Sequence, residues 1–260
     1  MKKMLTALLL AALLTGLCAC AGMPEPPTQA PTETTTAASE PTETTTEAPE
    51  TTTAVPETTT EAPKAVLNQT YRAAQLYHDE YGVLWVQVIA EVRNDGDTPL
   101  TLDDGAVRLF GGGAELTVLD HVAAYPQCIA PGERAVYYEE KAIDTQYEGE
   151  VTLELSCGGE PIERAARYAV SDAELRASGS GIRSLTGTVK NDTKQPGELV
   201  CVAAVLYDEQ QQPLGVLYYY LLETLRPGAE QSFTLEPYRL PDAVRYADAD
   251  SFRVYAYPVG

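Results

Sequence analysis

Apolar and polar side chains alternate with a period of two residues along most of the chain after Leu67. In the segment 84–93, Leu, Val, Val, Ala and Val alternate with Trp, Gln, Ile, Glu and Arg. This alternation of β-forming residues predicts a half-buried strand. The Asn94-Asp95-Gly96 that follows is a strong turn signal. The same pattern predicts four further strands, at 106–110, 115–125, 134–143 and 150–157.

The segment after these strands is harder to assign. Gly158-Gly159 suggests a hairpin turn, so that 161–170 would form the next strand. Pro161 also suits the first position of a helix, so a short helix is the alternative. We favour the strand.

Landmarks recur in the two halves of the chain. Asn94-Asp95 recurs as Asn191-Asp192, 97 residues later, and a Leu-aromatic pair follows each Asn by fifteen residues. A Pro-Gly turn at 131–132 recurs at 227–228, with an offset of 96 residues. We therefore predict an all-β protein with two tandem, homologous immunoglobulin-like β-sandwich domains of the usual size. The predicted domains are 64–172 and 173–260, with 171–181 as the joint.

The second copy also resembles a known family. The matching residues are Gly187-Thr188-Val189-Lys190-Asn191, Val205-Leu206-Tyr207-Asp208, Pro213-Leu214-Gly215, Pro227-Gly228 and Phe233. Over about 181–257 the chain resembles the FxLYD domain, a bacterial extracytoplasmic immunoglobulin-like module. Ala204 stands where that family has the Phe of its name. The resemblance implies an immunoglobulin-like fold and no catalytic residues, and the first copy shares it more weakly, through Leu109-Phe110-Gly111.

The N-terminus has the features of an export signal. Two lysines precede an apolar run, Leu5 to Leu17, that is shorter than the roughly 20 residues of a membrane span. The run ends in Leu17-Cys18-Ala19-Cys20, which resembles a bacterial lipobox. The resemblance implies that a signal peptide, 1–19, is removed and that Cys20 carries the lipid. The alternatives are an ordinary secretory signal and an uncleaved helical anchor.

A low-complexity segment follows the lipobox. Fifteen Thr, eight Glu and eight Pro fill most of residues 21–63, and Glu-Thr-Thr-Thr occurs four times. Such a composition cannot bury enough apolar surface to offset the entropy of ordering. We predict that 20–63 is a disordered stalk that holds the folded part away from the membrane. The alternative is a disordered tail without a spacing role.

The charge excludes one class of partner, and the motifs suggest no chemistry. A net charge of −20 disfavours nucleic acid, because phosphate binding needs a footprint of Lys and Arg. The two histidines, His78 and His121, lack metal-ligand spacing, and a pair of His121 with Cys128 lacks an orienting group. We predict no catalytic residue, no cofactor and no metal site. Calcium bound by loop aspartates, among them Asp242, Asp248 and Asp250, is the less favoured alternative.

Three cysteines remain after the predicted lipidation site. Cys128 and Cys157 fall near strand ends in the same predicted domain, so a disulfide between them fits an oxidising exterior. The alternative is that both are buried free thiols. Cys201 lies between Val200 and Val202 and is predicted to be a core residue.

Tyrosine is unusually frequent, with sixteen residues against three Phe. Exposed tyrosines on a sheet can stack on sugars or line a protein interface. The alternative is that they only fill half-buried strand positions. The candidate binding face comprises Tyr218, Tyr219, Tyr220, Tyr255 and Tyr257.

Together these features predict a non-catalytic binding or scaffolding protein of the bacterial cell envelope. It would be anchored to the cell membrane by its lipid and would face the extracytoplasmic side. Its expected partners are a cell-wall glycan or another exported protein. The alternatives are an accessory envelope enzyme with a site between the domains, and an assembly or sensory subunit of a membrane complex.

Overall fold

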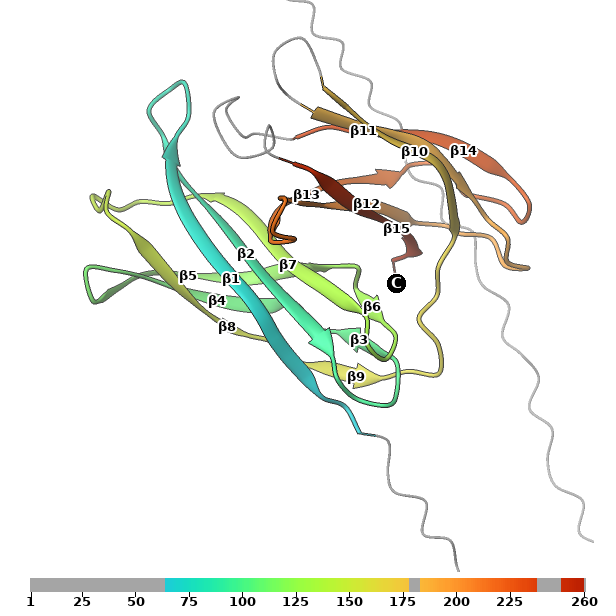
Figure 1. Cartoon of the computed structure of the whole chain (residues 1–260), viewed down its shortest axis with the longest axis horizontal. Helices are drawn as coiled ribbons and strands as arrows, with labels where there is room; N and C mark the ends of the chain where they lie inside the picture. Colours follow the sequence, from blue (N-terminus) through green and yellow to red (C-terminus); the bar gives the residue numbers. More distant parts are fainter. Residues whose placement is uncertain (1–63, 178–182, 238–248, 260) are drawn as a thin grey trace, which may run out of the picture. The chain divides into compact units, whose positions relative to one another are not determined.

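All regular structure in the described part of the chain is β-strand, as predicted. The structure is a computed structural model that describes residues 64–177, 183–237 and 249–259. The predicted signal peptide 1–19, Cys20 and the predicted stalk 20–63 lie outside these residues. The described strands belong to one compact unit, in which two lobes can be distinguished (Figure 1).

The first lobe contains nine strands in two sheets. A six-stranded antiparallel sheet has the order β1-β2-β7-β5-β4-β8, and a small sheet has the order β6-β3-β9. The strands are β1 (Leu67–His78), β2 (Leu84–Asn94), β3 (Leu100–Leu102), β4 (Gly105–Gly111), β5 (Ala114–Tyr125), β6 (Cys128–Ile129), β7 (Arg134–Ala142), β8 (Val151–Ser156) and β9 (Gly159–Pro161). The five strands predicted from alternation between residues 84 and 157 are therefore confirmed.

The six-stranded sheet is nearly closed into a barrel. β5 pairs with β4 over most of its length and then with β7 over Ala123–Tyr125. The two end strands of the sheet, β1 and β8, contact each other. The side chains that alternate inward fill the interior, including Val88, Ala90, Val92, Leu109, Val122 and Tyr137.

The second lobe contains six strands in two three-stranded sheets, ordered β10-β11-β14 and β13-β12-β15. The two sheets enclose a core to which both contribute, including Leu185, Val202, Leu206, Leu217, Phe233 and Ala256. The strands are β10 (Ala169–Ala177), β11 (Arg183–Lys190), β12 (Val200–Tyr207), β13 (Pro213–Leu221), β14 (Glu230–Leu235) and β15 (Ser251–Pro258).

The two lobes have the same strand order. β1-β2-β7 corresponds to β10-β11-β14, and β5-β4-β8 corresponds to β13-β12-β15. The lobes differ because β5, with twelve residues, extends to β7, whereas β13, with nine residues, stays in the sheet of β12. The same six-strand plan therefore gives a nearly closed sheet in the first lobe and two separate sheets in the second.

The repeated Asn has the same structural role in both lobes. The Asn94 amide donates to the carbonyls of Thr98 and Ile129, and the Asn191 amide donates to those of Gln195 and Leu225. Each Asn is fully buried. Each main-chain carbonyl of these Asn residues accepts a bond from the Gly of the Pro-Gly turn, whose φ is positive, near 77° in both lobes. The repeat read from the sequence thus reflects one turn-fixing motif used twice.

The connection between the lobes differs from the prediction. The predicted joint was 171–181, and for residues 171–177 this prediction was wrong. These residues belong to β10, which pairs with β11. In β10 the pairing register shifts after Ser171, where Asp172 takes a positive φ of 52°. This shift interrupts the alternation of apolar and polar residues that would have indicated a strand. The predicted boundary between residues 172 and 173 lies within β10, and residues 178–181 lie outside the described part.

The predicted hairpin after Gly158-Gly159 was also wrong. β9 ends at Pro161 and pairs with β3 instead of β8. Residues 162–168 form no strand and connect the lobes. The main-chain amide of Ile162 donates a hydrogen bond to the Pro99 carbonyl of the first lobe. The main-chain amide of Tyr168 donates one to the Ala256 carbonyl of the second lobe. Polar residues such as Glu163 and Arg164 lie exposed along this crossing, so it lacks the alternation that a sheet requires.

Candidate functional site

The lobes meet through one face of the second lobe. On β12, Cys201, Ala203, Val205 and Tyr207 point away from the lobe's own core and pack in a third buried cluster. The first lobe contributes Ile89, Tyr125, Val136 and Tyr138 to that cluster. β13 contacts β2 and β7 of the first lobe (Figure 1). We call this contact the junction.

The structure separates the five predicted binding-face tyrosines. Tyr218, Tyr220, Tyr255 and Tyr257 lie beside Cys201 or Ala203 in the sheet register, so they share the face that meets the first lobe. Tyr257 is buried in the junction and Tyr255 packs partly buried against it. Tyr218 and Tyr220 are 40% and 37% exposed. Tyr219 is 45% exposed and belongs to the opposite face of β13.

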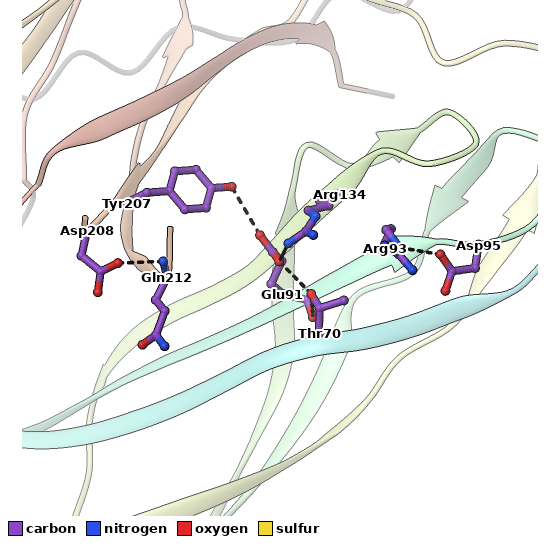
Figure 2. A network of polar contacts seen from close by, with 8 residues as sticks. All are labelled: Thr70, Glu91, Arg93, Asp95, Arg134, Tyr207, Asp208 and Gln212. Carbon is purple, nitrogen blue, oxygen red and sulfur yellow. Dashed lines mark hydrogen bonds and ion pairs between the residues drawn. The ribbon is translucent and has the colours of Figure 1, made fainter. Parts of the chain in front are cut away.

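A buried charged network fixes the junction. Glu91, on β2, is almost fully buried and forms an ion pair with Arg134 of β7. Thr70 donates a hydrogen bond of 2.7 Å to the same carboxylate, and the Tyr207 hydroxyl of the second lobe donates to it across 3.5 Å. Figure 2 shows Tyr207 pointing at Glu91, with Thr70 and Arg134 on the other side of the carboxylate. The carboxylate is thus satisfied from both lobes.

Two further side chains cross the junction. Gln87, buried on β2, donates to the Leu214 carbonyl of the second lobe at 3.4 Å. Arg167, in the connection between the lobes, donates to the Cys128 carbonyl. Its guanidinium lies over the rings of Tyr255 and Tyr257, at 5.8 and 5.9 Å from their centroids. The lobes are therefore held by polar contacts as well as by apolar packing.

A cavity of about 290 Å³ opens beside these contacts, and both lobes line it. This volume lies just below the range of roughly 300–1,000 Å³ typical of small-molecule sites. We call it the junction cavity. Its lining residues are Tyr125, Tyr138, Glu139, Glu140, Val216, Tyr218 and Glu236.

Tyrosine rings form one wall of the junction cavity. Tyr125 of the first lobe stacks on Tyr218 of the second, with ring centroids 4.9 Å apart and an interplanar angle of 28°. Tyr220 meets Tyr218 edge-on at 5.9 Å. Burial raises the pKa of Tyr218 above its usual value, so its hydroxyl stays protonated at neutral pH. Tyr218 is thus held by two rings and presents a neutral aromatic surface.

Carboxylates form the rest of the polar lining. Glu139 and Glu140 follow Tyr138 on β7, and Glu236 follows the end of β14. Burial raises the pKa of Glu139 above its usual range, although Lys141 and the Glu140 amide act in the opposite direction. Tyr138 donates a hydrogen bond to Glu140. The cavity therefore combines aromatic surface with a concentration of negative charge.

The sequence indicated only part of this site. Tyr218 belonged to the predicted face, but Tyr125, Tyr138 and the three glutamates were not singled out. Tyr137-Tyr138-Glu139-Glu140 is the local signal that could have drawn attention to β7, because carboxylates directly follow buried aromatics there.

The other candidate residues do not form a site within the described part of the chain. Exposed His121 contacts Asp104 at 3.3 Å, and the Cys128 thiol faces the Thr101 hydroxyl at 3.6 Å. No cluster of metal-ligating residues occurs among residues 64–177, 183–237 and 249–259. Of the aspartates considered for calcium, Asp242 and Asp248 lie outside these ranges. Within them, no helix has the length and apolar character needed to span a bilayer.

The three described cysteines are free thiols, and Cys201 is buried. Cys128 and Cys157 are half-buried, and the disulfide between them stays a prediction. Burial raises the pKa of Cys201 to about 11 and raises that of Cys157 above its usual value.

Cys201, the buried thiol, should react more slowly than the half-buried Cys128 and Cys157. At pH 8 we expect iodoacetamide to leave Cys201 unmodified in the folded protein and to modify it once urea unfolds the chain, because only the thiolate reacts. Peptide mass spectrometry after labelling measures each site. Rapid labelling of Cys201 under native conditions would contradict its place in the junction. A mass loss of two hydrogens shared by Cys128 and Cys157 would establish the disulfide.

The chain matches no protein-family model and shows no significant similarity to a curated protein.

Proposed function

We propose that this chain is a lipid-anchored, non-catalytic binding protein on the extracytoplasmic side of a bacterial membrane. Its two lobes would be tandem immunoglobulin-like β-sandwich modules, the second of them FxLYD-like. Residues 20–63 would hold them away from the lipid. The lipobox-like Leu17-Cys18-Ala19-Cys20 and the Thr/Glu/Pro-rich segment support the anchor and the spacer.

The observation that carries the binding role is the junction cavity. It takes residues from both lobes, including Tyr138 and Tyr218, and the hydrogen bond from Tyr207 to Glu91 links the same two lobes. Aromatic walls with a few convergent polar groups are typical of ligand sites. A purely structural contact between the lobes does not require a cavity lined by glutamates.

Co-sedimentation tests this function on the chain from Ala21 onward, which lacks only the predicted signal peptide and lipidated cysteine. We expect saturable pelleting with isolated cell-wall sacculi, and weaker pelleting of the Tyr218→Ala variant. Glu223→Gln, which replaces an exposed residue outside the cavity lining, should pellet like the wild type. Equal pelleting of all three proteins, or none at any salt or calcium concentration, would contradict a wall ligand in the cavity.

A further inference from the structure

We propose that the junction cavity binds a compact organic cation, an ammonium group, between the ring of Tyr218 and the carboxylates of Glu139 and Glu236. This inference rests on the proposed binding function and names the ligand class of the same site.

The charge of the lining supports a cation. Three of the seven described lining residues are glutamates, and none is Lys, Arg or His. Among the described residues, Lys141 is the cation that acts on Glu139, and it is an exposed residue of the same strand that lies outside the lining. A phosphate or carboxylate ligand would be repelled by the carboxylates of Glu139 and Glu236. A cation would instead be attracted by the carboxylates of Glu139 and Glu236.

The aromatic wall supports an organic cation over a metal ion. A ring face attracts an ammonium group through its quadrupole, and the attraction grows when the site is shielded from water. Tyr125 stacks on Tyr218, and Tyr220 lies nearly perpendicular to it, so the orientation of the Tyr218 ring does not have to be acquired on binding. Hard metal ions instead require several oxygen ligands at short distance, and the described lining residues form no such cluster.

The size of the cavity limits the ligand. At about 290 Å³ it accommodates a methylated ammonium group or the end of a lysine-like chain, and it cannot enclose a long polymer. Two sources share this chemistry: quaternary ammonium head groups, and primary amines carried by peptides or amino sugars. Separate probes distinguish them.

Isothermal titration of the chain from Ala21 onward with tetramethylammonium and with n-butylammonium tests the inference, with tert-butanol as the uncharged comparison. We expect saturable binding of at least one cation and none of tert-butanol. Glu236→Gln and Tyr218→Leu should each weaken that binding by about three- to tenfold, whereas Glu223→Gln should not change it. Glu236 is exposed, so its substitution does not threaten the fold. Tighter binding of tetramethylammonium would indicate a quaternary source, and tighter binding of n-butylammonium a primary amine.

The pH dependence is the second arm of the same test. Glu139 shares the cavity lining with Tyr125 from β5, Tyr218 from β13 and Glu236 after β14. On its own strand, Tyr138 and Glu140 also line the cavity, and Lys141 acts on its carboxylate. Because its pKa lies above the usual 4.5 and a bound cation would lower it, cation affinity should rise with pH until Glu139 is fully ionised. Ordinary glutamates are ionised at lower pH than Glu139. In the Glu139→Gln variant, cation affinity should therefore no longer increase over the higher pH range in which Glu139 ionises.

Three results would overturn the inference: equal binding of tert-butanol, an equal effect of Glu223→Gln and Glu236→Gln, or no saturable cation binding. The last result together with saturable pelleting on sacculi would leave the binding function standing with another ligand class. If the protein bound a cation but did not pellet with sacculi, the cation would remain the ligand class, and the cell wall would be rejected as its source.

Discussion

Replacing Arg134 by Met should destabilise the protein by about 3 kcal/mol, because it leaves a buried carboxylate without its counter-ion. The Glu91 side chain is 2% exposed and Arg134 is its ion-pair partner. Thr70 and Tyr207 would still donate hydrogen bonds, but neither carries charge. Urea unfolding followed by circular dichroism gives the change in free energy of unfolding.

Arg108→Met is the matched control for this substitution. Arg108 is also a strand arginine paired with two glutamates, Glu115 and Glu154, but its side chain is 54% exposed. Exposed pairs contribute at most about 1 kcal/mol. The double variant Arg134→Met with Glu91→Gln should recover part of the loss, because it removes the charge that would be stranded. If Arg134→Met costs no more than Arg108→Met, Glu91 is not buried as described.

Replacing Asn191 by Ala should destabilise the protein by about 2–4 kcal/mol. The buried Asn191 amide donates to the carbonyls of Gln195 and Leu225 at 2.8 and 2.7 Å, and its oxygen accepts from Thr193. Alanine would leave these groups without partners in a place that water does not reach. The same unfolding measurement gives the loss.

The neighbouring residue and the other lobe supply two comparisons for Asn191. Lys194→Ala changes an exposed side chain in the same loop and should alter stability by less than about 0.5 kcal/mol. Asn94→Ala should cost about as much as Asn191→Ala, because Asn94 makes equivalent bonds to Thr98 and Ile129. Unequal losses would show that the two turns do not have the same energetic role.

Much of this fold could be read from alternation and turn residues. Leu84–Asn94 forms β2 with the predicted bounds to within a residue, since its side chains alternate without interruption. The repeated Asn and Pro-Gly landmarks predicted equivalent turns because a buried amide and a positive φ restrict the residues that can serve there. Because such local requirements allow few residue types, they can be recognised in a single sequence.

The errors have a local physical cause as well. β10 was read as a joint because the register shift at Ser171 breaks the period of two, so Val170 and Leu175 no longer fall on one predicted face. Residues 159–161 join β3 instead of β8, and that pairing is set by contacts almost sixty residues apart. A single sequence read locally contains neither piece of information.

The site was less predictable than the fold. The face bearing Tyr218 was expected, but Tyr257 on the same face is buried by the first lobe. The partners of Tyr218 in the cavity come from β5, β7 and the end of β14. Only the docking of one lobe on the other brings them together, and alternation within each strand does not specify that docking.

The most direct test of the central claim, that a primary ammonium group of the cell wall is held in the junction cavity and mediates envelope binding, is pelleting on chemically modified sacculi. The chain from Ala21 onward would be sedimented with native sacculi and with the same sacculi after acetylation of their free amino groups. The account predicts saturable pelleting on native sacculi and its loss after acetylation, because acetylation removes the ammonium charge. Equal pelleting on both preparations would contradict it.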